Sequence, residues 1–179
     1  GLGWRLRRHF FVPPPGTPPT WYRFFVWAGF GYPIGAAGHG FFIWLLFTIN
    51  QPALAWFNVG SALLYLGCIV GHRRGYFRLC YGAAAVEILV HATLATAYMG
   101  WDAGFTYHDL ICVVAVMFAP FLSNRMKMAT CAGIALLLAA TFVYTRTVAP
   151  WRPPAEDAIL ILQSVNLLLF TLILAVAAY

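Results

Sequence analysis

Residues 79–100 read LCYGAAAVEILVHATLATAYMG, an apolar run interrupted by one carboxylate, Glu87, and one histidine, His91. A helix needs about 20 predominantly apolar residues to cross a bilayer, and this run is long enough. The stretch therefore predicts a transmembrane helix that carries two ionisable groups.

The whole chain has the composition of this stretch. Of its 179 residues, 62% are hydrophobic and 9% are charged, whereas about a quarter of the residues in a soluble domain are charged. The mean hydropathy of +0.77 also favours lipid as the solvent. These values exclude an ordinary soluble enzyme domain.

Six apolar segments are separated by turn-forming or charged residues. They cover residues 22–48, 53–71, 79–100, 104–123, 127–147 and 157–179. The sequence thus predicts an all-α integral membrane protein with six transmembrane helices over residues 22–179. Residues 1–21 form a basic, proline-rich N-terminal arm that is expected to be cytoplasmic.

Basic residues predict the orientation of these helices. Nine of the eleven lie on one side of the predicted segments, namely Arg5, Arg7, Arg8, Arg23, Arg73, Arg74, Arg78, Arg125 and Lys127. Only Arg146 and Arg152 lie on the other side. Because basic loops stay in the cytoplasm, both termini are expected to be cytoplasmic, in the inner membrane of a bacterium.

Ionisable residues inside the predicted helices are the candidate functional groups, since each costs about 2.5–3.5 kcal/mol at the centre of a membrane helix. Such groups can fix helix packing or bind a small lipophilic ligand. They can also bind a metal or haem b, with His39 and either His91 or His108 as axial ligands. The spacing demands no metal, and we assign none. We expect a ligand site at His39, Glu87, His91, His108 and Asp109.

The first predicted helix is rich in small residues. Gly31 and Gly35 form a GxxxG pair, and Pro33 lies between them. Small residues let helices approach closely, which favours tight packing within the chain or in a dimer. A kinked helix beside a ligand cavity is the alternative.

Sequence motifs for catalysis and for metal binding are lacking. The chain contains no GxSxG, HExxH or phosphate-binding loop. Its cysteines show no CxxC spacing and are expected to be buried apolar side chains, at Cys68, Cys80, Cys112 and Cys131. We therefore expect no catalytic residue here, and the basic charge indicates membrane topology rather than nucleic-acid binding.

Three segments resemble parts of known six-helix membrane domains. Trp27–Pro33, WAGFGYP, is similar to the opening of the sensor domains of bacterial quorum-sensing histidine kinases. Met99–Phe105, MGWDAGF, resembles a stretch in the membrane domains of bacterial class III adenylyl cyclases, and the connection Pro150–Pro154 is similar too. The resemblance implies a sensory or anchoring domain that passes a signal through its last helix to a cytoplasmic cyclase or kinase.

Two other functions remain open from the sequence. The chain can be an accessory or scaffold subunit of a respiratory or photosynthetic membrane complex. It can also be a b-type cytochrome. The expected partners are the lipid bilayer, a small lipophilic ligand, and either a second copy of the chain or a larger membrane complex.

Overall fold

The computed structural model describes residues 10–178, which are helical apart from short connections and contain no strand. The elements are η1 (Pro19–Trp21), α2 (Tyr22–Thr48), α3 (Pro52–Arg73), α4 (Phe77–Met99), η2 (Trp101–Ala103), α5 (Tyr107–Phe118), α6 (Asn124–Thr147) and α7 (Glu156–Ala178). Five of these helices, α2, α3, α4, α6 and α7, are long and apolar enough to cross a membrane. The predicted all-α class is confirmed.

Local sequence explains where the long helices begin and end. Pro52 occupies the first turn of α3, where its missing N–H costs no hydrogen bond. The Ser123 hydroxyl caps α6 by accepting a hydrogen bond from the Met126 N–H at 3.3 Å. Gly75 and Gly100, which follow α3 and α4, both have positive φ. The five long helices begin and end within three residues of the predicted bounds.

The fourth predicted segment is shorter than expected. It was predicted over residues 104–123, but the helix α5 covers only Tyr107–Phe118, and its 12 residues rise about 18 Å. Gly104 adopts a left-handed conformation with φ +81° and delays the start of the helix. At the other end, Ala119 is extended before Pro120, because a residue before proline disfavours the helical region.

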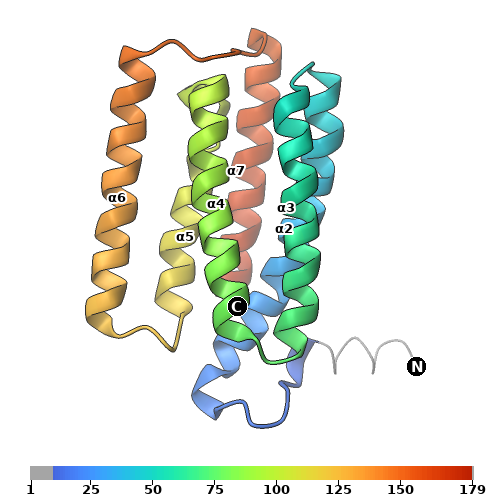
Figure 1. Ribbon diagram of the computed structural model, residues 1–179, viewed down its shortest axis with the longest axis vertical. Helices are drawn as coiled ribbons and strands as arrows, with labels where there is room; N and C mark the ends of the chain where they lie inside the picture. Colours follow the sequence, from blue (N-terminus) through green and yellow to red (C-terminus); the bar gives the residue numbers. More distant parts are fainter. Residues whose placement is uncertain (1–9, 179) are drawn as a thin grey trace.

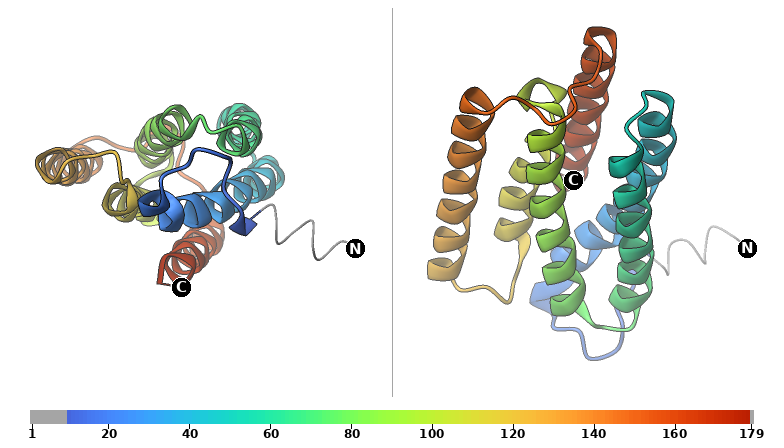
Figure 2. Two further views of the ribbon diagram at one scale, coloured as in Figure 1. Left: turned by 90° about the horizontal axis from the view of Figure 1, so that it is seen from below. Right: turned by 45° about the horizontal axis from the view of Figure 1, so that its top comes forward.

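The helices run up and down in one bundle (Figure 1). Viewed from one end, α2 and α5 lie between α4 on one side and α7 on the other (Figure 2). α6 stands at the edge of the bundle, and only Ile134 and Thr141 of this helix are buried. α2 packs mainly against α3 and also contacts α7, whereas α4 and α5 each contact three helices of the bundle.

Basic residues gather at one end of the bundle. The start of α2, the α3–α4 connection and the α5–α6 connection all lie at the lower end of Figure 1. In the described part of the chain, this end carries Arg23, Arg73, Arg74, Arg78, Arg125 and Lys127. Three further basic residues were predicted to lie on this side, and they are outside the described residues: Arg5, Arg7 and Arg8.

The described part of the arm packs against the bundle. The carbonyl of Val12 accepts a hydrogen bond from the Arg73 guanidinium at 3.0 Å. The ring of Phe10 stacks on Phe30 of α2 with centroids 4.5 Å apart. Residues 10–21 thus fold back onto the basic end of α2 and α3.

Two apolar clusters form most of the core. The cluster at the basic end comprises Phe24, Phe25, Ala28, Tyr32, Tyr65, Cys68, Phe77, Cys80 and Ala84. The cluster at the opposite end comprises Phe42, Leu45, Leu46, Leu54, Ala55, Ala95, Met99, Ala103, Phe105 and Leu162. Along α2, α3 and α4, polar side chains lie between the two clusters.

Candidate functional site

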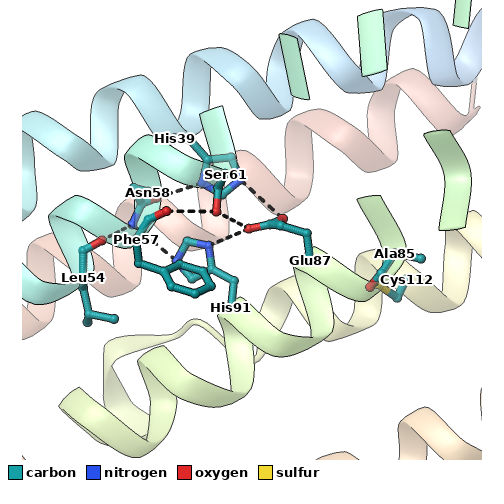
Figure 3. Close-up of polar contacts among 9 residues, drawn as sticks. All are labelled: His39, Leu54, Phe57, Asn58, Ser61, Ala85, Glu87, His91 and Cys112. Carbon is teal, nitrogen blue, oxygen red and sulfur yellow. Dashed lines mark hydrogen bonds and ion pairs between the residues drawn. The ribbon is translucent and has the colours of Figure 1, made fainter. Parts of the chain in front are cut away.

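The polar side chains between the two clusters belong to three helices. His39 comes from α2, whereas Glu87 and His91 are one turn apart on α4 and share a face (Figure 3). α3 completes the group, which we call the polar layer: His39, Asn58, Ser61, Glu87 and His91.

The Glu87 carboxylate is the centre of the polar layer. Its Oε1 accepts hydrogen bonds from the Ser61 hydroxyl at 2.5 Å and from His91 Nδ1 at 3.1 Å. Its Oε2 lies 3.6 Å from His39 Nε2. Oε2 is buried, and the described residues give it no hydrogen bond. One of the two carboxylate oxygens is thus fully engaged and the other is not.

Asn58, which is fully buried, sets the orientation of the His39 ring. Its amide Nδ2 donates to the carbonyl of Leu54 at 2.8 Å, so its Oδ1 is the atom that faces His39. Since Oδ1 can only accept, His39 Nδ1 must carry the proton in the 2.8 Å bond between them. When the ring is neutral, the lone pair of His39 Nε2 therefore points toward Glu87.

The two histidine rings do not fit a haem with two axial imidazoles. Such a haem holds its imidazoles end-on from opposite faces of the macrocycle. His39 and His91 instead stack with centroids 5.0 Å apart and an interplanar angle of 26°. Pairing His39 with His108 is no better, since the cavity that both line, at about 100 Å³, is too small to enclose a porphyrin.

That cavity opens beside the polar layer and has largely apolar walls. Its polar end is formed by His39, Glu87, His91 and His108. Trp27 also lines it, and the described residues give the indole N–H of Trp27 no hydrogen-bond partner. The remaining walls include Gly31, Tyr32, Gly38, Phe42, Tyr65, Tyr81, Ala84, Leu169 and Ile173.

The last helix contributes directly to the cavity wall. Leu169 and Ile173 of α7 line the cavity, whereas five other large apolar side chains of this helix are exposed, namely Leu160, Ile161, Leu167, Leu168 and Leu172. Only Ala158, Leu162 and Asn166 of this helix are buried. A molecule in the cavity would therefore contact α7 directly.

Four of the five predicted site residues meet at the cavity, and the fifth does not. His39, Glu87, His91 and His108 line it, whereas Asp109 does not. Asp109 is fully buried, and both its carboxylate oxygens lack a hydrogen bond from the described residues. Adjacent residues of a helix point about 100° apart, and on α5 His108 is directed to the cavity whereas Asp109 is not.

Sequence reasoning did not assign the α3 side chains to the site. Asn58, Ser61 and Tyr65 are spaced i, i+3 and i+7 in an apolar helix, which places them on one face. That spacing is the signal that would have identified them. Tyr65 lines the cavity, and its ring lies 5.1 Å from that of His39.

The glycines of α2 serve both close packing and the cavity. A Cβ built on Gly35 would collide with the ring of Tyr65, so α2 and α3 approach closely here. Gly31 and Gly38 line the cavity, and a Cβ on Gly31 would meet nothing within 4 Å. α2 also continues through Pro33 as one helix. The small residues of α2 thus allow close packing against α3 and also line the cavity.

Comparison with known proteins places the chain in no family. No family model, no curated protein and no solved structure matches it. The fold and the site define an all-helical bundle with membrane-length helices and a small internal cavity that has one polar end.

Proposed function

We propose that this chain is a membrane-embedded sensory domain that binds a small lipophilic molecule in its cavity. It crosses the inner membrane of a bacterium with six segments, α5 and its flanking residues being one, and both termini are cytoplasmic. Binding is passed through α7 to a cytoplasmic effector of the adenylyl cyclase or histidine kinase type.

One observation carries this proposal: the cavity combines largely apolar walls, one polar end and a wall formed by α7. Ligand sites of this kind are lined by apolar and aromatic side chains, with a few polar groups that set orientation. Because Leu169 and Ile173 belong to the wall, a ligand can favour one position of α7. Coupling of this kind needs only about 1–3 kcal/mol.

The outer surface of the bundle supports placement in a bilayer. Large apolar side chains are exposed along the long helices, for example Leu136 of α6 at 72% and Leu168 of α7 at 69%. In water such a surface would aggregate, whereas lipid solvates it. The basic end of the bundle then faces the cytoplasm by the positive-inside rule.

Filling the cavity tests the proposal. Gly31→Leu places a side chain into the cavity, whereas Gly40→Leu adds the same side chain to the same helix outside it, and neither position has a heavy atom within 4 Å of a built Cβ. We expect short-chain alcohols and methyl ketones, which are small enough for a cavity of about 100 Å³, to raise the melting temperature of the wild-type protein in detergent. The Gly40→Leu variant should respond equally, and the Gly31→Leu variant should not.

Two outcomes would contradict this function. A panel in which no probe shifts the wild-type melting temperature would leave the cavity without a ligand. Equal shifts in wild type, Gly31→Leu and Gly40→Leu would mean that the probes act on the outer surface. Circular dichroism of each variant controls for correct folding.

A further inference from the structure

We propose that His39, Glu87 and His91 form a binding site for a divalent first-row transition-metal ion, with Zn²⁺ as its representative. The site lies inside the helical bundle at the polar end of the cavity. This inference goes beyond the sensory function and does not depend on it, because the ion is bound by the chain alone.

The ligand atoms of the three side chains already lie close to one another. One ligand atom from each can be chosen such that all three lie within 4.8 Å of one another. In a tetrahedral zinc site with bonds of about 2.0–2.1 Å, ligand atoms are about 3.4 Å apart. His39 Nε2 and Glu87 Oε2 are separated by 3.6 Å, and His91 Nδ1 and Glu87 Oε1 by 3.1 Å. An ion therefore fits with small side-chain movements.

The second observation is a buried carboxylate oxygen that has no hydrogen bond from the described residues. Glu87 is 8% exposed, and the oxygen is its Oε2. The atom that faces it, His39 Nε2, presents a lone pair when the ring is neutral, because Asn58 holds the proton on Nδ1. Among the described residues, no Lys or Arg lines this cavity. A cation between the two atoms satisfies both.

Asn58 also provides the outer-sphere contact that metal-binding histidines typically have. A ligating imidazole usually donates its other N–H to a carbonyl or carboxylate, which fixes the ring. The bond from His39 Nδ1 to Asn58 Oδ1 at 2.8 Å has this form and exists without the ion. His39 is thus oriented for coordination through Nε2.

Coordination changes the proton position on His91. Its Nδ1 now donates to Glu87, and its Nε2 lies 3.4 Å from the Asn58 amide nitrogen. Binding the ion through Nδ1 releases that proton or moves it to Nε2, as metal binding commonly does. The 3.4 Å contact with Asn58 is then lost, but it is longer than the usual 2.7–3.2 Å.

The ligand chemistry defines the class of ion. Imidazole nitrogen suits zinc, copper, iron and nickel, whereas magnesium and calcium prefer oxygen ligands. Two histidines and one glutamate leave a fourth position open, and here that position faces the cavity. The open position can be taken by water or by an oxygen or nitrogen atom of a small molecule.

Metal titration tests the site directly. The protein is purified in detergent without a polyhistidine tag, stripped with a chelator, and titrated with Zn²⁺ against a chromophoric zinc indicator. Co²⁺ then reports the ligand geometry through its visible absorption. We expect one ion per chain, the d–d bands of four-coordinate Co²⁺, and no competition from excess Mg²⁺ or Ca²⁺.

Matched variants identify the ligands. Glu87→Gln removes the carboxylate from the site and should abolish binding. Asp109→Asn removes another buried carboxylate, one that does not line the cavity, and should bind as the wild type does. His39→Gln provides an independent ligand deletion. Circular dichroism shows whether each variant is folded.

Asn58→Ala tests the outer-sphere contact. It removes the oxygen that accepts from His39 Nδ1. Outer-sphere contacts of this kind change metal affinity by about 10–100-fold, so this variant should bind Zn²⁺ at least tenfold more weakly. An absence of stoichiometric binding by the wild type, or affinities unchanged in Glu87→Gln and His39→Gln, would overturn the proposal.

Discussion

At Gly35 the backbone of α2 lies directly against the ring of Tyr65. This contact brings α2 and α3 close together one helical turn before His39. The hydrogen bond from His39 to Asn58 spans the same pair of helices. The absence of a side chain at one position thus supports the geometry of the polar layer.

Gly35→Ala should destabilise the protein, because the Tyr65 ring is held between helices and must move to admit a methyl group. Overpacking of this kind costs about 1–3 kcal/mol. Gly40→Ala is the matched control: its Cβ meets no atom within 4 Å, and alanine is favoured over glycine in a helix by about 0.5–1 kcal/mol. Thermal unfolding in detergent compares the two, and a Gly35→Ala variant as stable as Gly40→Ala would refute the argument.

The site residues differ in how visible they are in the sequence. His39, Glu87 and His91 could be predicted because ionisable groups are costly in lipid and stand out in apolar runs. Ser61 and Asn58 are uncharged and are tolerated in many membrane helices, so their presence alone indicates little. Which of the adjacent residues His108 and Asp109 lines the cavity depends on the rotation of α5 about its axis, and hydropathy does not define that rotation.

At the scale of elements, α5 differs most from its neighbours. It follows a turn in which Gly104 has φ +81°, and a Cβ there would lie 3.2 Å from the Gln163 backbone of α7. This close contact ties the start of α5, and with it His108, to the last helix. The turn is therefore part of the route by which the cavity and α7 are connected.

Gly104→Ala should weaken this junction, since it combines an unfavourable φ with a close contact to backbone. Such strain costs about 1–3 kcal/mol. Gly82→Ala, within α4 and with open space around the built Cβ, should leave stability unchanged or slightly raise it. Hydrogen exchange of the α5 amides localises the effect. Equal exchange in both variants would show that the turn does not hold α5.

Element boundaries were predictable where composition changes sharply. α3 ends at Arg73, before Arg74 and Gly75, and α4 ends at Met99, before Gly100, and those signals lie in the sequence. The reduced length of α5 was not predicted, because the flanking residues 104–106 and 119–123 are mostly apolar or small and extend the hydropathic segment. Pro120 was the available signal, and a helix end at the preceding residues is its usual effect.

For the whole molecule, the basic end predicts orientation in the membrane. Tyr76 lies in the α3–α4 connection at this end, whereas Asp102 lies in the α4–α5 connection at the other, and both are exposed. A single cysteine at each position reports its side. The native cysteines are buried or half-buried, so the unmodified chain serves as the background.

In spheroplasts, a membrane-impermeant maleimide should label Asp102→Cys and leave Tyr76→Cys unlabelled. After permeabilisation both should react. The expectation follows from the retention of basic loops in the cytoplasm. The opposite labelling pattern would invert the proposed orientation and place both termini outside.

The polar layer has one more consequence, for the vertical register of the helices. Lipid tails are about as apolar as leucine side chains, so apolar layers alone do little to oppose the sliding of one helix along another. A slip of α3 by one turn, about 5.4 Å, would keep leucine beside leucine but would separate Asn58 and Ser61 from their partners on α2 and α4. The hydrogen bonds of the polar layer thus fix the axial register of α2, α3 and α4.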